Sequence, residues 1–237
     1  MYGPNRRTIC HAYKFPYLAC KRPLGARAIG QPWLRHCIVL DVNNNTLEVF
    51  CDFDRNSSMT WTRIISYSRE NKGSDNMGHT LTASFAINEN DPSWSKYRLS
   101  KSRMESIEQD STKWRATCRY ETDGVLYTDY LRVSIEELNI FDGKCVRVEY
   151  IDVRGQHCNN CKVYMRQNAG HLVHMFLQEG VGDECEFKPF LGKTWVWEVA
   201  SYQKGYYYFG HYYRMDSRHR CTSSTNATTQ TWLGAED

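Results

Sequence analysis

Long apolar runs are missing from this chain: no stretch approaches the ~20 apolar residues that a membrane-spanning helix needs. The sequence also lacks Gly-x-Ser-x-Gly, His-Glu-x-x-His and a glycine-rich phosphate loop, which are common signatures of enzymes. Basic residues form no block, and 30 Lys and Arg stand against 27 Asp and Glu. We therefore expect no membrane insertion, no enzymatic activity and no nucleic-acid partner.

Cysteine, by contrast, is abundant, with ten in 237 residues. Cytosolic proteins rarely hold so many thiols without a metal or a redox function, whereas secreted domains hold them as disulfides. We predict that most or all of the ten are oxidised, with at most two free thiols. The ten cysteines are Cys10, Cys20, Cys37, Cys51, Cys118, Cys145, Cys158, Cys161, Cys185 and Cys221.

Glycosylation sequons of the form Asn-x-Ser/Thr begin at Asn44, Asn56 and Asn226, each in a polar, turn-like stretch. Together with the cysteines they predict a secreted, extracellular glycoprotein. The segment Met1–Arg7 is not followed by the apolar core of a signal peptide. We therefore expect the true N-terminus, with its signal peptide, to lie upstream of this start.

The first half of the chain predicts antiparallel strands. Residues 37–42 and 47–53 form a hairpin around three asparagines at 43–45, because Asn tolerates the positive φ of tight turns. Alternate residues from Leu47 to Phe53 share one apolar face. A third strand is expected over 60–67, and a long polar loop over 69–92.

The middle of the chain predicts a helix and further strands. Ser102-x-x-Glu105 is a capping-box pattern that starts a helix, with Met104 and Ile107 facing inward. Residues 113–120 alternate as a half-buried strand. One face holds Trp114, Ala116, Cys118 and Tyr120, and the other, exposed, holds Lys113, Arg115, Thr117 and Arg119.

The remaining pattern completes the fold prediction. Ser134-x-x-Glu137 is interpreted as the cap of a short helix, residues 145–153 as a strand, and the Ser/Thr/Asn-rich tail from Arg218 as a loop. The sum is an α+β fold of antiparallel sheets with few short helices, stapled by disulfides.

Two motifs resemble a known family. Val49-Phe-Cys-Asp-Phe-Asp54, followed by Met59-Thr-Trp-Thr-Arg-Ile-Ile65, is similar to the opening of a fibrinogen-related domain of the invertebrate type. Residues 94–100, 114–120 and 147–155 extend the likeness. The intelectin-like lectins are a more distant comparison.

The resemblance implies a fibrinogen C-terminal-like domain over 20–237, after a cysteine-containing extension over 1–19. It also implies a disulfide between Cys20 and Cys51, with Cys37 as a rival partner across the hairpin. Calcium is a cofactor in this family, but the Asp-x-Asp calcium loop has no match in this sequence. We therefore carry over no calcium site.

A zinc site is the alternative for one cluster. His157, Cys158, Cys161, His171 and His174 are the ligand types that zinc prefers. However, nine residues separate Cys161 from His171, and an oxidising compartment favours disulfides. We predict no metal.

An aromatic segment near the C-terminus is the candidate binding site. Trp195 and Trp197 precede a run in which Tyr207, His211 and Tyr213 share one face of a strand. Such a face either packs in the core or stacks on sugar rings. We take these five residues as the candidate ligand-binding residues.

The functional hypothesis is an extracellular recognition or adhesion domain that binds carbohydrate or glycoprotein ligands, as a lectin does. The alternative is a structural protein of the extracellular matrix with no discrete small-molecule site. Either form is compatible with an oligomer.

Overall fold

The computed structural model describes residues 34–40, 46–53, 58–72, 83–137, 144–168, 171–174, 185–187, 209, 215 and 217–236. These residues form one antiparallel sheet in the order β1-β2-β3-β10-β5-β6-β7-β8-β9, with β4 beside β3. The strands are β1 (Leu34–Leu40), β2 (Thr46–Phe53), β3 (Met59–Ser68), β4 (Lys96–Arg98), β5 (Lys113–Cys118), β6 (Tyr130–Ser134), β7 (Lys144–Val153), β8 (Gln156–Asn168), β9 (His171–His174) and β10 (Thr228–Glu236).

Three short helices accompany the sheet in the described part of the chain: α1 (Lys101–Gln109), α2 (Tyr120–Asp123) and the 3-10 helix η2 (Arg220–Thr222). The predicted combination of antiparallel sheet, few short helices and disulfides is therefore confirmed. No helix within the described residues has the length and apolar character needed to cross a membrane.

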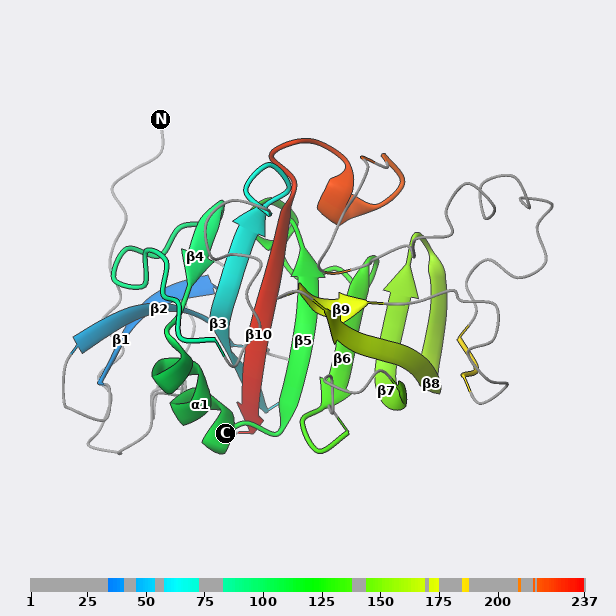
Figure 1. Ribbon diagram of the computed structural model, residues 1–237, viewed down its shortest axis with the longest axis horizontal. Helices are drawn as coiled ribbons and strands as arrows, with labels where there is room; N and C mark the ends of the chain where they lie inside the picture. Colours follow the sequence, from blue (N-terminus) through cyan, green and yellow to red (C-terminus); the bar gives the residue numbers. More distant parts are fainter. Residues whose placement is uncertain are drawn as a thin grey trace.

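The C-terminal segment lies in the middle of the sheet, so its prediction as a loop is wrong. Strand β10 pairs with β3 on one side and with β5 on the other (Figure 1). Its threonines are β-branched and pack well on a pleated surface, and Trp232 and Leu233 are buried. The polar composition of the tail concealed a strand whose two edges are both paired.

The predicted hairpin is confirmed, with Leu40 opposite Thr46 at its closed end. Strands β3 and β7 also agree with the predicted runs over 60–67 and 145–153. Strand β8 was not predicted. It pairs with β7 along almost its whole length, from Val153 opposite Gln156 to Lys144 opposite Met165.

Helix α1 begins at Lys101 with Ser100 as its N-cap, so the capping box at Ser102 is wrong. The backbone N–H of Ser100 donates to the Glu89 carboxylate, which fixes the entry of the chain into the helix instead. Met104 and Ile107 are buried, as predicted. Ser134 ends β6 and opens a turn over residues 135–137, so a helix does not begin there.

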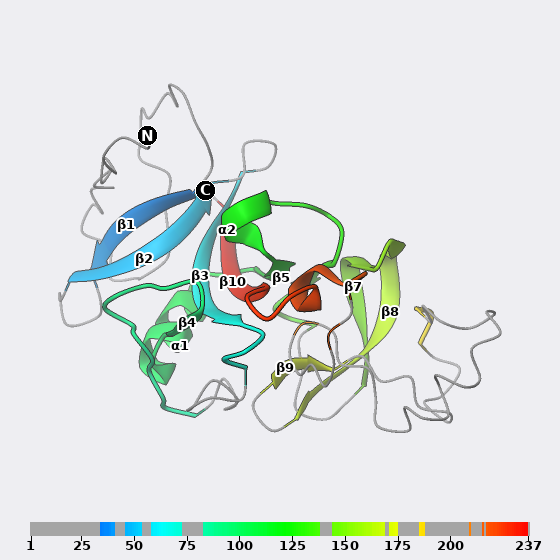
Figure 2. The same ribbon diagram turned by 90° about the horizontal axis from the view of Figure 1, so that it is seen from above.

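Helices α1 and α2 cover opposite faces of the sheet (Figure 2). Helix α1 packs against the larger apolar core, which contains Trp114, Leu131 and Ile151. Helix α2 lies on the other face, where Tyr120 joins a smaller cluster with Trp61 and Trp232. Both faces of the central strands are therefore buried.

Tyr120 was expected to continue β5, but it belongs to α2. Arg119 takes a left-handed backbone conformation (φ 54°), which ends the strand after Cys118 and turns the chain onto the other face. The side chain of Tyr120 therefore lies across the sheet from Trp114.

Disulfides are confirmed for seven cysteines. The structure pairs Cys118 with Cys221, Cys145 with Cys185 and Cys158 with Cys161. Cys51 is also disulfide-bonded. Because the six cysteines beyond position 110 pair with one another, the bond from Cys51 runs to the N-terminal region. The side chains of Cys10, Cys20 and Cys37 lie outside the described residues.

Candidate functional site

Most of the predicted ligand-binding and glycosylation residues lie outside the described residues. These are Trp195, Trp197, Tyr207, His211, Tyr213, Asn44 and Asn56. Asn226 is described, and it is exposed in the turn before β10, where a glycan would meet solvent. The side chains of His171 and His174 are not described.

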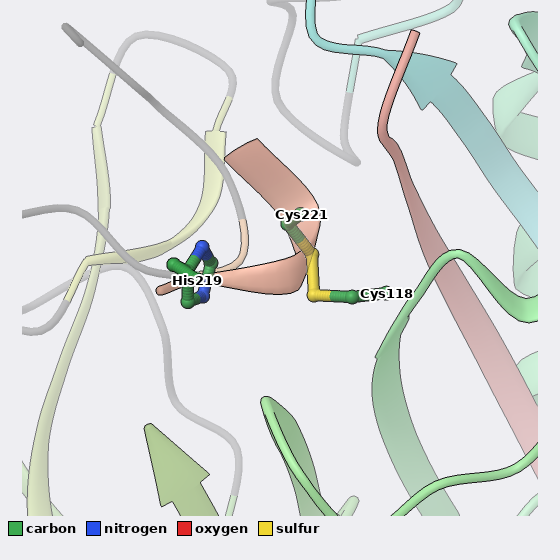
Figure 3. A group of neighbouring side chains, drawn as sticks. All are labelled: Cys118, His219 and Cys221. Atoms are coloured by element: carbon green, nitrogen blue, oxygen red, sulfur yellow. A yellow bond between two sulfur atoms is a disulfide. The ribbon is translucent and has the colours of Figure 1, made fainter. Parts of the chain in front are cut away.

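A group of metal-ligand types surrounds η2, namely Cys118, His219 and Cys221, whose potential ligand atoms lie within 4.8 Å of one another. Figure 3 shows that the two sulfurs are bonded to each other, with the His219 ring beside the short helix. A thiolate is the species that binds a metal, so the oxidised pair offers none. The predicted alternative of zinc at Cys158 and Cys161 meets the same difficulty, because those two sulfurs are also joined.

A buried aspartate ties this disulfide to the neighbouring loops. Asp129 accepts hydrogen bonds from the backbone N–H groups of Arg154 (2.7 Å) and Arg220 (2.8 Å), and its carboxylate lies 3.7 Å from His219. Asp129 itself has a positive φ of 50°, a conformation that Asp tolerates better than most residues. It therefore fixes the segment that leads into β6.

Arg115 was predicted to be exposed, and this is wrong. Its side chain is buried on the α2 face, where Nη2 donates to the Asp52 carboxylate at 2.6 Å. Its guanidinium also lies 4.4 Å from the ring centre of Trp61 and 4.7 Å from that of Trp232. Burial alone would lower the pKa of Arg115, but the Asp52 charge outweighs it and raises that pKa.

A second buried cation, Arg63, is surrounded by aromatic rings instead of a carboxylate. Its guanidinium lies 4.1 Å from the ring centres of both Phe50 and Trp94, and 4.6 Å from that of Tyr97. Within the described residues none of its three nitrogens has a hydrogen-bond partner. Burial lowers the pKa of Arg63 to about 9, against the smaller opposing effects of Tyr97 and Glu121.

The aromatic side chains of this face continue to the surface at β6 and β7. Tyr127 lies edge-on to Tyr130 (5.1 Å between centroids) and to Tyr150 (5.7 Å), and Tyr150 stacks on His157 at 6.4 Å. Tyr127 is 51% exposed and Leu126 is 45% exposed. We call Leu126, Tyr127, Tyr150 and His157 the tyrosine patch; three of them are exposed, and Tyr150 is half-buried.

The tyrosine patch is held in place from below. The hydroxyl of Tyr150 donates to the backbone carbonyl of Tyr127 at 2.9 Å, and the buried ring of Tyr130 supports both. Burial raises the pKa of Tyr130 to about 12 and also raises that of Tyr150. Both phenols are therefore neutral at physiological pH.

Charged side chains border the patch. The Glu149 carboxylate lies between two cations: Lys113 Nζ donates to Oε1 at 2.5 Å, and Arg132 Nε lies 2.8 Å from Oε2. All three side chains are partly exposed, with Arg132 at 28%. Charged groups therefore lie beside the aromatic rings of the patch.

The sequence contained a signal for this site that the prediction did not use. In β6 and β7, tyrosines and charged residues alternate with buried aliphatic residues, as in Tyr130, Leu131, Arg132 and Val133. Alternation shows which residues share a face, but the neighbouring strand depends on long-range pairing.

Comparison with protein-family models, with curated proteins and with solved structures found no match for this chain.

Proposed function

We propose that this protein is an extracellular recognition domain, without catalytic activity, that binds carbohydrate or glycoprotein ligands through the tyrosine patch. The observation that carries the proposal is the exposed Tyr127 ring beside Tyr150 and His157. Tyrosine combines a large apolar ring with a hydroxyl, so it can stack on the C–H face of a sugar and hydrogen-bond to its hydroxyls.

The compartment in this proposal rests on the disulfides. Seven oxidised cysteines are typical of secreted proteins and rare in cytosolic ones. The exposed Asn226 supports a glycoprotein. The fibrinogen-related fold remains our proposal for the family, and binding at the tyrosine patch requires neither calcium nor another metal.

A glycan array tests the proposal, with the whole chain probed in calcium and in chelator. We expect binding in both conditions. Tyr127→Ala should weaken binding about tenfold, which corresponds to about 1.4 kcal/mol. Phe85→Ala is the matched control, because Phe85 is also an exposed aromatic residue (38%) but lies on the loop before β4.

The outcomes separate the hypotheses. Unchanged binding by folded Tyr127→Ala would remove the tyrosine patch from the interaction. Absence of binding to any glycan would favour the alternative of a structural matrix protein.

A further inference from the structure

We infer that the ligand of the tyrosine patch is an acidic saccharide, and that Arg132 binds its carboxylate or sulfate group. This inference rests on the proposed function and specifies the class of ligand. It depends on the position of Arg132, on its unused hydrogen-bonding groups and on the local charge.

The register of the sheet places Arg132 next to the aromatic platform. Arg132 of β6 is directly opposite Tyr150 of β7. Opposite residues on one face have Cβ atoms about 4.5–5.5 Å apart, within reach of long side chains. Tyr130, two residues before Arg132, lies under the same platform. A sugar ring stacked on Tyr150 would therefore bring its substituents to Arg132.

The two terminal nitrogens of Arg132 are not engaged by the protein's own acids. Its Nε lies 2.8 Å from Glu149 Oε2 as an ion pair without a hydrogen bond, whereas Nη1 and Nη2 pair with none of the described residues and are not among the buried atoms. These two nitrogens form a planar fork that matches a carboxylate or a sulfate in a bidentate arrangement. Glu149 lies beside Nε and leaves the two terminal nitrogens available.

The charge at this position favours an anion. Lys113, Glu149 and Arg132 together carry a net charge of +1, because one carboxylate serves two cations. The nearest further acid, Asp152, is buried, and its carboxylate accepts the backbone N–H groups of Asp129 and Gly155, which offset part of its charge.

The same triad also has a simpler explanation, as a surface ion-pair network that joins β5, β6 and β7. Exposed pairs of this kind contribute about 0–1 kcal/mol to stability. That explanation predicts no effect of Arg132 on ligand choice, so binding measurements distinguish the two.

The experiment uses the whole chain and three probes: a glucuronate-containing tetrasaccharide, its carboxyl-reduced neutral counterpart, and a sulfated neutral tetrasaccharide. We expect at least tenfold tighter binding of an acidic probe than of the neutral one. Arg132→Gln should abolish that preference, and Arg132→Lys should retain part of it, because Lys keeps the charge but lacks the fork.

The matched control is Lys101→Gln, which makes the same change in net charge on α1, away from the patch. It should leave the preference unchanged. The probe that Arg132 distinguishes, carboxylated or sulfated, identifies the acidic group.

Each failure has a separate meaning. If Arg132→Gln leaves all three affinities unchanged while Tyr127→Ala weakens them, the acidic-ligand inference fails and the proposed function stands. If neither substitution matters, both fail. If a poly-glutamate peptide binds as tightly as the saccharide and in the same Arg132-dependent way, the saccharide assignment is overturned in favour of an acidic polypeptide.

Discussion

The two faces of the sheet are both buried, but they are built from different chemistry. On the α1 face, Trp114, Leu131 and Ile151 form an apolar core. On the α2 face, charged and aromatic side chains are interleaved, with Arg115 and Arg63 beside Trp232. Adjacent residues of β5 therefore enter two unlike interiors.

The two interiors also differ in what their stability depends on. An apolar core is stabilised in proportion to the area it removes from water, by about 25 cal/mol per Å². A buried ion pair gains little net stability over an apolar pair, but it is costly to break, because the remaining charge is uncompensated. The α2 face is thus more sensitive to the loss of one partner than to the loss of both.

The buried pair also defines long-range geometry. Asp52 belongs to β2 and Arg115 to β5, and β3 and β10 lie between them, a span of roughly 14 Å at the usual strand spacing. The side chain of Arg115 passes over the rings of Trp61 and Trp232 to reach Asp52. It therefore requires four strands to be in register at once.

The largest expected effect compares two neighbours on β5. Trp114→Ala should reduce the free energy of unfolding by about 3–5 kcal/mol through the cavity it leaves. Arg115→Ala should cost at least about 3 kcal/mol, because Asp52 remains buried without its cation. Urea unfolding at neutral pH measures both.

A double variant sharpens this comparison. Arg115→Met combined with Asp52→Leu should regain most of the loss, since an apolar pair of similar volume replaces the ion pair. A second substitution at a residue next to Trp114 should not regain the stability that Trp114→Ala loses. A double variant as unstable as Arg115→Ala would show that the α2 face depends on the charges themselves.

An intermediate effect is expected at Gly234, where β10 lies close to side chains of the α2 face. A Cβ placed at Gly234 would lie 2.6 Å from the indole ring of Trp61, which rests across β10. Gly234→Ala should therefore reduce the free energy of unfolding by about 1–3 kcal/mol through overpacking. Trp61→Phe in the same background should recover part of the loss, because the smaller ring makes room; no recovery would place the strain elsewhere.

Where one face of a strand is apolar and the other polar, the sequence was sufficient to predict the apolar face. The hairpin was predicted from its asparagine turn and its shared apolar face, and Trp114, Ala116 and Cys118 of β5 were predicted to be buried from alternation. Arg115 was misplaced because alternation separates two faces but does not say what covers each. The polar face of β5 is covered by α2 and by the segment that contains Trp94. Neither contact can be predicted from the residues next to it in the sequence.

Two further features that the sequence analysis did not predict have similar causes. Strand β10 was missed because threonine is common in loops, and only its pairing with β3 and β5 distinguishes it. The tyrosine patch combines residues from β6, β7 and the segment before β6, which the fold brings together. The sequence analysis could select candidate residues that follow one another in a single aromatic run, but it had no means of combining residues from three separate segments.

The smallest expected effect concerns an ion pair at the margin of the α2 face. Arg220 donates from Nη2 to the Asp123 carboxylate at 2.7 Å and to the carbonyl of Cys118, and from Nη1 to the carbonyl of Thr128. Partial burial alone would raise the pKa of Asp123, but the hydrogen bonds and charge of Arg220, aided by Thr122, lower it. Both side chains of this pair reach solvent, with exposed fractions of 16% for Arg220 and 25% for Asp123, so its contribution should be about 1 kcal/mol.

The sign of its pH dependence follows from the lowered pKa. In the unfolded chain Asp123 has an ordinary pKa, so the pair's contribution is fully present above that value and is lost as pH falls through the lower pKa of the folded state. Asp123→Asn should therefore be slightly less stable than the unmodified protein at pH 7, and the difference should vanish in acid. Asp91→Asn, an exposed loop position, controls for net charge. A difference that persists undiminished in acid would show that the Asp123 side chain acts through its hydrogen bonds and not through its charge.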